Sequence, residues 1–389
     1  MTLKITILGA TGSIGKSTLE IVRQHPDHFK IVGLSTNTNI KLFEKLIKEF
    51  RPKKAVIANK SFFKKTLSFS GVKIIAGEEG LLEISGDPDT DVVVAGIVGF
   101  AGLSSVMAAT RAGKRVLLAN KEALVCAGNL MVENCFASNA EIIPIDSEHN
   151  AIFQCLGVGY RCFYKAKNLS KVILTASGGP FRTWKEKEIE NATVEQAIAH
   201  PNWTMGKKIS VDSATMINKA LEIIEAHWLF NLKSSEIEVV IHPESIIHSM
   251  IEFSDKAVLA QLGQPDMRVP IASGLAWPNR LDMDLQGLDW RDIKTFNFES
   301  PDDKRFPAIP LAREVLNSGG SLGAVMNAAN EVAVLSFLNG DIAFGSIIGM
   351  VYDSLEKFSQ IASQNISSLD ELIILDNSVR QFCTKLIKI

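Results

Sequence analysis

The sequence has few cysteines and no long apolar run. Its five cysteines follow no CxxC or zinc-finger spacing, so we expect free thiols in a reducing compartment. The longest apolar stretch, residues 92–103, contains three glycines and is shorter than the roughly 20 residues that a bilayer requires. No leader-like basic and apolar segment precedes the first predicted strand. These absences predict a cytoplasmic protein without a transmembrane helix.

Neither sign of charge is in excess. Lys and Arg number 41, Asp and Glu number 43, and the formal net charge is -2. Composition therefore gives no support to a nucleic-acid footprint or a polybasic membrane patch, and we expect a small-molecule partner. The 389 residues are 46% hydrophobic and 22% charged, which is typical of a globular chain. At roughly 150 residues per domain, that length predicts two or three domains.

The first part of the chain alternates between strand and helix patterns. Apolar, β-branched runs predict strands, and amphipathic segments at 40–50 and 103–112 predict helices between them. Such alternation indicates right-handed βαβ units and a parallel, doubly wound sheet. The predicted strand segments are residues 3–8, 29–34, 54–58, 72–76, 91–96 and 115–121.

A glycine-rich turn follows the first strand. Gly9, Gly12 and Gly15 form a GxxGxxG variant of the dinucleotide fingerprint, in which the pyrophosphate approaches a helix N-terminus. The same segment fits a loose P-loop pattern, although no strand ends in an Asp suited to hold magnesium, and a purely structural turn is a third reading. The second strand ends in residues 35–39, STNTN, with no carboxylate to repel a 2′-phosphate, which favours NADP over NAD.

Polar side chains gather where later strands end. Residues 115–121 bring Asn120, Lys121 and Glu122 to the ligand-binding edge of the sheet, where a solvated turn lysine is the plain alternative. Residues 141–150 are predicted to continue an apolar strand into Asp146 and Glu148, with period-2 alternation placing both carboxylates on one face.

Three patches in the middle of the chain carry possible chemistry. Residues 172–181 are predicted to run as a strand into a Ser-Gly-Gly turn at Ser177 that could cradle a phosphate. Residues 200–206, HPNWTMG, suit a mobile covering loop, or a loop that simply packs its Trp. Residues 211–230 are predicted to be one helix that presents Asn218, Glu222 and Glu225 on a shared face.

The acids of these segments suggest a metal site. Asp146, Glu148 and Glu222 would offer the oxygen ligands that magnesium or manganese prefers, and no His/Cys set indicates zinc. The alternative at the helix is a surface ion pair between Lys219 and Glu222, worth only tenths of a kcal/mol. Apolar neighbours around these residues leave little room for a solvated face.

Six segments resemble, in the same order, the 1-deoxy-D-xylulose 5-phosphate reductoisomerase family. They are GATGSIGKSTLE, ANKEALV, IDSEHNAIFQ, TASGGPF, HPNWTMG and DSATMINKALEIIEAHWLF. The resemblance implies NADPH-dependent rearrangement and reduction of 1-deoxy-D-xylulose 5-phosphate to 2-C-methyl-D-erythritol 4-phosphate for isoprenoid synthesis. It also implies a divalent metal (magnesium, manganese or cobalt) and a homodimer.

The resemblance also implies a role for each matching residue. The implied metal ligands are Asp146, Glu148 and Glu222, and the implied catalytic residues are Lys121, Glu148, His200 and Glu222. The implied substrate contacts are Lys121, Ser147, Glu148, Ser177, His200, Trp203, Ser213, Asn218, Lys219 and Glu222, with Ser177, Ser213, Asn218 and Lys219 as the phosphate clamp. The implied NADPH contacts are Thr11, Gly12, Ser13, Ile14, Asn39, Asn120, Glu122 and Gly206.

One departure concerns the cofactor. Family members often carry a Gly-basic-Asn triplet after the second strand, where this chain has Asn37, Thr38 and Asn39, so the strength of 2′-phosphate recognition is open. Two other functions are compatible with a dinucleotide-binding fold. A Rossmann-type sugar or hydroxy-acid dehydrogenase would share the fold without needing three converging carboxylates, and a non-catalytic NADP-binding sensor would need no turnover.

We expect an α/β chain built from three parts and a linker. Residues 1–146 are predicted to form a Rossmann-like NADPH-binding domain, and residues 147–276 a central α/β catalytic domain with the flap. Charges and breakers in residues 277–303 are typical of a linker, and helical patterns predict a C-terminal bundle over 304–389. The bundle carries no chemical motif, so we expect it to support the active-site wall.

Overall fold

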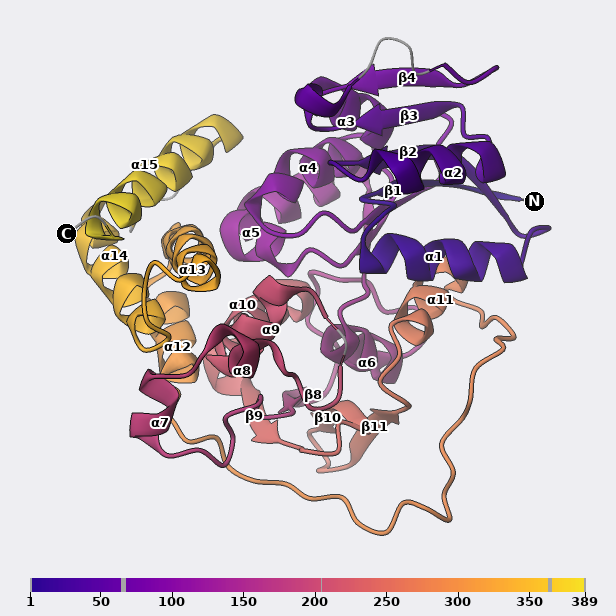
Figure 1. Ribbon diagram of the computed structural model, residues 1–389. Helices are drawn as coiled ribbons and strands as arrows, with labels where there is room; N and C mark the ends of the chain where they lie inside the picture. Colours follow the sequence, from indigo (N-terminus) through magenta and orange to yellow (C-terminus); the bar gives the residue numbers. More distant parts are fainter. Residues whose placement is uncertain (1, 64–67, 204, 363–365, 388–389) are drawn as a thin grey trace.

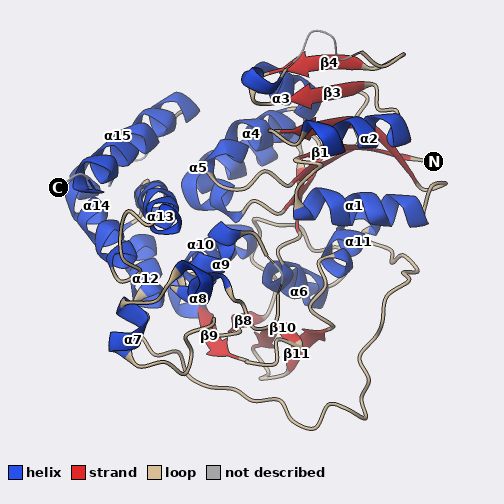
Figure 2. Cartoon of the chain, in the orientation of Figure 1, coloured by secondary structure: helices blue, strands red, loops and turns tan. Residues whose placement is uncertain are grey.

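The computed structural model describes residues 2–63, 68–203, 205–362 and 366–387 (Figure 1). Thr204, inside the predicted covering loop 200–206, lies outside the described residues. A large sheet with helices on both sides forms the N-terminal part, a smaller sheet lies below it, and helices alone form the C-terminal end (Figure 2). This arrangement confirms the predicted fold class.

The large sheet has seven parallel strands in the order β4-β3-β2-β1-β5-β6-β7. Its strands are β1 (Leu3–Leu8), β2 (Phe29–Thr36), β3 (Lys54–Ile57), β4 (Lys73–Ala76), β5 (Val92–Ala95), β6 (Arg115–Leu118) and β7 (Glu141–Pro144). The connecting helices are α1 (Ser13–Gln24), α2 (Ile40–Phe50), α3 (Glu78–Ser85), α4 (Leu103–Arg111) and α5 (Lys121–Ser138), with short 3-10 helices at Lys60–Phe62 and Phe100–Gly102.

Strand β5 is apolar at every position because both of its faces are covered. Val92 and Val94 join the core under α1 and α2, whereas Val93 and Ala95 join the core on the other face, with α3, α4 and α5. Successive side chains point to opposite faces of a strand, and helices cover both faces here. Every position is therefore buried, and the apolar run marks a central strand of a doubly wound sheet.

The second sheet has four strands in the order β11-β10-β8-β9. Its strands are β8 (Leu169–Ala176), β9 (Ile237–Ile241), β10 (Ile247–Phe253) and β11 (Val258–Leu262), and β8 pairs parallel with β9 but antiparallel with β10. Its helices are α6 (Ser147–Leu156), α7 (Glu186–Glu190), α8 (Val194–Ile198), α9 (Lys207–Ala214), α10 (Ile217–Phe230) and α11 (Arg268–Ala276), with a 3-10 turn at Ser234–Glu236. Although α11 falls within residues 147–276, its Ile271 and Leu275 share a core with β1.

Two local predictions were wrong. Strand β7 ends at Pro144, so Asp146 and Glu148 do not alternate along a strand: Asp146 is the N-cap of α6 and Glu148 lies in its first turn. The predicted single helix 211–230 is two helices, because Met216 adopts a left-handed conformation (φ 61°) between α9 and α10. Both differences occur at the cavity described below.

The predicted linker, residues 277–303, has no helix and only an isolated bridge from Glu299 to Ile241. It follows the outside of the molecule as a long loop (Figure 1) and leads to the helices α12 (Ala308–Ser318), α13 (Leu322–Asn339), α14 (Ser346–Ala362) and α15 (Leu369–Ile387). Helix α13 lies so close to α5 that a Cβ at Gly323 would be 2.3 Å from the carbonyl oxygen of Val125. Among the described helices, none has the length and apolar character of a membrane span.

Candidate functional site

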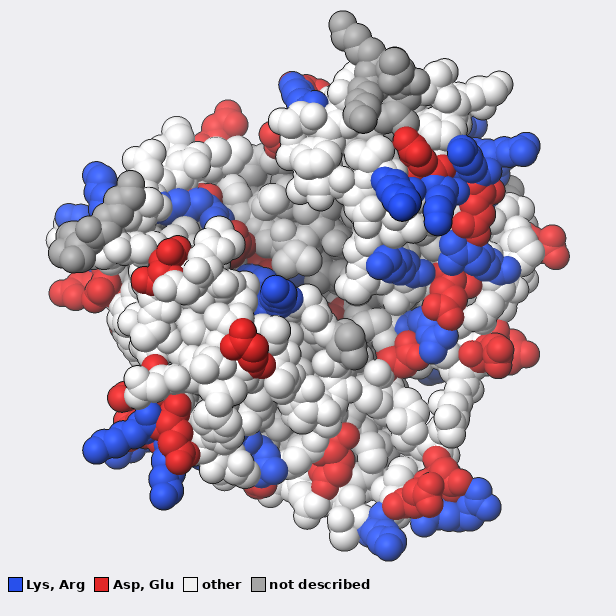
Figure 3. Space-filling view, viewed as in Figure 1, with Lys and Arg blue, Asp and Glu red and all other residues white. Residues whose placement is uncertain are grey.

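A cavity of about 410 Å³ lies between the carboxyl ends of the large-sheet strands and the small sheet with its helices. On the face seen in Figure 3, charged side chains of both signs cover α1 and α2, where Arg23 pairs with Glu49 at 2.5 Å. The cavity wall brings together these predicted metal and substrate residues: Lys121, Asp146, Ser147, Glu148, Ser177, His200, Trp203, Ser213, Asn218, Lys219 and Glu222.

Three carboxylates meet at one end of this cavity. Oxygen atoms of Asp146, Glu148 and Glu222 all lie within 4.8 Å of one another, and Glu222 is fully buried. The N-cap position of Asp146 and the first-turn position of Glu148 turn both acids toward α10, which carries Glu222. The start of α6 therefore brings Asp146 and Glu148 together, where the sequence had predicted a strand to do so.

Two buried lysines face these carboxylates. Lys121 Nζ lies 2.7 Å from Asp146 Oδ2 and 3.0 Å from Glu222 Oε1, and it donates to Asn218 Oδ1 at 3.0 Å. Lys219 Nζ donates to Glu148 Oε1 at 2.8 Å, to the carbonyl of Thr175 at 2.5 Å and to Glu222. The Lys219–Glu222 pair is thus buried, so the alternative of a surface ion pair is wrong.

Burial and charge act in opposite directions on these groups. Burial alone would lower the pKa of Lys121, but Asp146 and Glu222 raise it well above its usual range. Burial alone would raise the pKa of Asp146, but Lys121 lowers it. For Glu222, burial and the neighbouring Glu148 raise the pKa. Both lysines stay protonated at neutral pH, and three carboxylates against two ammonium groups favour an additional cation.

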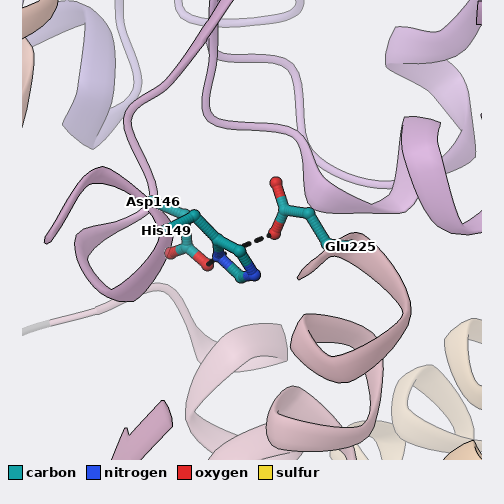
Figure 4. Close-up of side chains that lie close together, drawn as sticks. All are labelled: Asp146, His149 and Glu225. Carbon is teal, nitrogen blue, oxygen red and sulfur yellow. Dashed lines mark hydrogen bonds and ion pairs between the residues drawn. The ribbon is translucent and has the colours of Figure 1, made fainter. Parts of the chain in front are cut away.

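A second buried group shares Asp146, and sequence reasoning missed its histidine. His149 Nδ1 lies 3.3 Å from Asp146 Oδ2 and 3.1 Å from Glu225 Oε2 (Figure 4). Its Nε2 donates to the carbonyl oxygen of Glu222 at 2.9 Å. Burial would lower the pKa of His149, but Glu225 and Asp146 raise it to about 9, and burial raises the pKa of Glu225 to about 8, so the two form a buried pair that holds Asp146. A helical reading of 146–149 would have placed His149 beside Asp146.

The predicted Ser-Gly-Gly turn lies against α9. Gly178 and Gly179 have φ values of 82° and 69°, and a Cβ at Gly179 would be 2.6 Å from the carbonyl oxygen of Ser213. Only glycine tolerates both the positive φ and this close approach. The turn thereby places Ser177 near Ser213 on the cavity wall.

The covering segment is fixed through His200. Its Nδ1 accepts from the backbone N–H of Asn202 at 3.2 Å and of Trp203 at 3.0 Å. Nδ1 is therefore unprotonated, and Nε2 donates to Ser177 Oγ at 3.0 Å. Burial lowers the pKa of His200, which agrees with a neutral ring.

Two further wall residues were also missed. The Trp203 ring lies 6.0 Å from that of His248 on β10, and Asn202 Nδ2 donates to Ser245 Oγ at 2.7 Å. His248 and Ser245 both line the cavity. A histidine within the strand pattern of residues 247–253 is a signal in the sequence that could have identified this wall.

The glycine turn joins the cavity from the side of the large sheet. Gly9 has φ 82°, its N–H donates to Ser35 Oγ at 2.9 Å, and no side chain caps the N-terminus of α1. A Cβ at Gly15 would be 2.5 Å from the backbone of Ala10, so α1 can approach the turn only with glycine there. An uncapped helix N-terminus beside such a turn is suited to a pyrophosphate.

The predicted cofactor residues divide into two groups. Ser13, Ile14, Asn120, Glu122 and Gly206 line the cavity, and Thr11, Gly12 and Asn39 lie outside its wall. Asn39 instead caps α2, accepting from the N–H of Leu42 at 3.3 Å. Lys208, which sequence reasoning missed, pairs with Glu122 at 2.8 Å and with Asp212 at 2.8 Å.

A dinucleotide-type turn and a carboxylate cluster that share one cavity are typical of an oxidoreductase with a divalent-metal site. Family models support a narrower assignment. Residues 5–128 match 1-deoxy-D-xylulose 5-phosphate reductoisomerase, residues 142–230 match its C-terminal domain, and residues 262–382 match a further DXP reductoisomerase C-terminal domain. The chain belongs to the 1-deoxy-D-xylulose 5-phosphate reductoisomerase family.

Curated relatives and solved structures agree with this assignment. Reductoisomerases of that name from Laribacter hongkongensis and Ralstonia nicotianae are 46% and 49% identical, covering 97% of this chain and 97% and 96% of their own. A DOX-P reductoisomerase crystallised with NADPH, fosmidomycin and magnesium is 43% identical with a TM-score of 0.93, covering 99% of this chain and 98% of its own. The Zymomonas mobilis enzyme in complex with NADPH is 42% identical with a TM-score of 0.90, covering 100% and 99%.

Proposed function

We propose that this chain converts 1-deoxy-D-xylulose 5-phosphate to 2-C-methyl-D-erythritol 4-phosphate with NADPH and a divalent metal. The observation that carries the proposal is the convergence of three features on one cavity in a member of this family. These features are the N-terminus of α1, the carboxylates of Asp146, Glu148 and Glu222, and the turn at Ser177. Solved relatives were crystallised in complex with NADPH and with magnesium.

The carboxylate cluster fits a divalent cation. Asp146, Glu148 and Glu222 would hold magnesium, manganese or cobalt through oxygen, and their excess over the two lysines supports that assignment. A bound divalent cation would polarise substrate oxygens and stabilise the negative charge that develops during carbon-skeleton rearrangement. His149 and Glu225 would keep Asp146 in place, because His149 contacts both carboxylates.

Lys121 would bind and orient the sugar portion. Its ammonium group is held by Asp146, Glu222 and Asn218, and its raised pKa keeps it a hydrogen-bond donor rather than a proton acceptor. A fixed cation next to the reacting oxygens stabilises developing negative charge without reorganisation. Ser147 would add a hydroxyl contact, since it lines the same wall.

The phosphate would bind between Ser177, Ser213, Asn218 and Lys219. Ser177 and Ser213 lie at the glycine turn, where a phosphate can approach them. Lys219, by contrast, already contacts Glu148 and Glu222. Phosphate binding would therefore draw Lys219 partly away from these carboxylates. Contacts remote from the reacting carbons supply binding energy for orientation. Trp203 would then cover the substrate and exclude water, since His200 fixes its backbone to Ser177.

NADPH would lie along the glycine turn toward the carboxylates. Ser13, Ile14, Asn120, Glu122 and Gly206 would contact it in the cavity, and Thr11, Gly12 and Asn39 at the adjoining turns. The cofactor supplies the hydride that reduces the rearranged aldehyde. Thr11 Oγ1 lies 2.8 Å from Thr36 Oγ1, so the two turns that would bind the cofactor are joined.

The assembly and location of the protein are part of the proposal. We infer a homodimer, supported by the exposed Val258 and Leu259 on β11, the edge strand of the small sheet. A cytoplasmic location is supported by the five cysteines, which are all free thiols.

One assay tests the proposed function. The protein is mixed with deoxyxylulose phosphate, NADPH and magnesium; NADPH absorbance is followed and the product is identified. We expect a branched polyol phosphate, dependence on the metal, and faster turnover with NADPH than with NADH. Absence of that product contradicts the proposal. Metal-independent reduction would indicate a simple dehydrogenase, cofactor binding without turnover would indicate a sensor, and a preference for NADH would overturn the NADP assignment.

A further inference from the structure

Helix α13 of the C-terminal bundle reaches the cofactor side of the cavity through one carboxylate. Glu331 Oε1 accepts from the backbone N–H of Phe100 at 2.9 Å and from Asn327 Nδ2 at 3.1 Å. Its other oxygen, Oε2, accepts from Arg380 at 2.6 Å, and Asp376 holds that guanidinium at 2.6 and 3.0 Å. Glu331 is thus fixed on both oxygens, and one of its partners lies 231 residues away in the chain.

The peptide group that Glu331 contacts is held from its other side as well. The carbonyl oxygen of Gly99 accepts from Asn120 Nδ2 at 3.0 Å, and this carbonyl belongs to the same peptide group as the N–H of Phe100. Because a peptide group is planar, an acceptor on its N–H and a donor on its C=O together fix its orientation. Glu331 and Asn120 therefore clamp one peptide plane between the bundle and the cavity.

Close packing shows that the clamp is tight. Gly99 has φ 77°, and a Cβ there would lie 2.5 Å from Glu331 Oε1. A Cβ at Gly102 would lie 2.2 Å from Asn120 Nδ2. Asn120 and the residues just before the clamped peptide line the cavity, namely Gly96, Ile97 and Val98. The Asn120 side chain also caps α5 by accepting from the N–H of Ala123 at 3.2 Å, so its amide has one favoured orientation.

We propose that Glu331 is a positioning residue for NADPH. It fixes the Gly99–Phe100 peptide, and through it the Asn120 amide and the 96–98 wall against which the dinucleotide binds. This inference rests on the proposed function for the cofactor, and it assigns the helical bundle a part in cofactor binding beyond support of the wall. Arg380 and Asp376 keep the Glu331 carboxylate aimed at the loop.

The test compares three substitutions in the full-length protein by direct titration of NADPH without substrate, read by fluorescence. Glu331→Leu removes the acceptor, and we expect NADPH to bind about 10-fold more weakly, in line with the loss of one hydrogen bond to a charged group. Glu331→Gln keeps a carbonyl acceptor for Phe100, so its dissociation constant should stay within about 3-fold of wild type. The KM for NADPH should follow these changes, while the KM for the phosphorylated ketose stays unchanged.

Arg313→Leu is the matched control. Arg313 on α12 also joins the bundle to the central domain, donating to the carbonyls of Ser234 at 2.5 Å and Ile237 at 2.9 Å, away from the clamped loop. We expect it to lower the melting temperature without changing NADPH affinity. If Glu331→Leu does not fold, Glu331→Asp, one methylene shorter, should show the same weakening.

Two outcomes overturn the inference. One is wild-type NADPH affinity in the Glu331→Leu or Glu331→Asp protein. The other is an equal loss of affinity in Arg313→Leu at a similar loss of stability, because a structural role alone would then explain both. A wild-type protein that binds no NADPH would overturn the proposed function as well, so the two failures are distinguishable.

Discussion

Glu222 on α10 balances the charge of two buried lysines. It is fully buried, it contacts both Lys121 and Lys219, and its backbone carbonyl accepts from His149. A buried carboxylate of this kind is stable only because cations face it. Removal of its charge leaves two ammonium groups with fewer partners and withdraws one oxygen ligand from the proposed metal.

Substitution Glu222→Gln tests this balance. The amide keeps the size of the side chain, so we expect the chain to stay folded by circular dichroism. Turnover at limiting magnesium should fall by about 100-fold or more, the scale on which removal of one electrostatic contact to a transition state acts. Glu236→Gln, whose carboxylate pairs with Lys165 outside the cavity, is the control and should change nothing. Near wild-type activity at limiting magnesium would contradict the metal assignment.

His200 makes the covering segment sensitive to pH. Its Nδ1 accepts two backbone N–H groups, and burial lowers its pKa below the usual value near 6.5. Between the folded and the unfolded pKa the unfolded state binds more protons, so this contribution to stability is lost as pH falls. Protonation of Nδ1 would break both hydrogen bonds and release Trp203.

The difference in fluorescence between wild type and Trp203→Phe isolates that indole. We expect it to change as pH falls below about 6.5, toward the lowered pKa of His200. In a His200→Asn background the side-chain oxygen can accept the same N–H groups without titrating, so the change should disappear. A pH-independent signal in the wild-type protein would contradict the role of His200 in holding Trp203.

At the scale of elements, hydrophobic periodicity in the sequence predicted most of the strands and helices. The strands were located because burial on both faces of a parallel sheet leaves an apolar pattern. The turn at Gly9–Gly15 was located from the spacing of its glycines. The start of α6 was missed because an apolar strand pattern leads directly into Asp146, and the break at Met216 was missed because no Gly or Pro marks it. His149 was missed together with the start of α6, which places it beside Asp146, and His248 was missed because its partner Trp203 comes from a distant segment.

Helix α1 provides a prediction at this scale. A Cβ at Gly15 would lie 2.5 Å from both Gly9 O and Ala10 Cα, which are backbone atoms that cannot move independently of the turn. We expect Gly15→Ala to cost about 1–3 kcal/mol of unfolding free energy, as overpacking does, and to weaken NADPH binding. Chemical denaturation measures the first effect and direct titration the second.

Gly86→Ala is the control for this substitution. The nearest atom to its Cβ would be 3.7 Å away, so its effect should be within about 0.5 kcal/mol. Equal stability of the Gly15→Ala and Gly86→Ala proteins would show that α1 can shift without cost, which contradicts a rigid cofactor turn.

At the scale of the whole molecule, the cavity is lined by residues of the large sheet and of the small sheet with its helices, and the helical bundle supports its wall. Helix α5 of the large sheet brings Lys121, helix α10 of the central domain brings Glu222, and helix α13 of the bundle holds Asp212 through Asn330 at 2.8 Å. Asp212 pairs with Lys208, which in turn pairs with Glu122. Neither the large sheet nor the small sheet with its helices carries all of the lining residues, so we expect activity to require both in this alignment.

The small sheet extends this argument to a second copy of the chain. Strand β11 pairs only with β10 among the described strands, and the Val258 and Leu259 side chains are 47% and 48% exposed. An apolar edge strand that remains open is prone to pair with another strand, and lysine on such an edge opposes pairing. Two copies joined at β11 would form one continuous sheet and hold the central domains, with their carboxylate clusters, rigidly together.

Leu259→Lys should therefore convert the proposed dimer to a monomer at micromolar concentration, as measured by sedimentation velocity. Leu335→Lys is the control, because Leu335 is 60% exposed on α13, which lies apart from β11 in Figure 1. It should leave the association unchanged. A monomeric wild type, or equal association of both variants, would contradict dimerisation through β11. If the Leu259→Lys monomer binds NADPH normally but loses turnover, the dimer contact acts on the central domain, since the cofactor turn belongs to the large sheet.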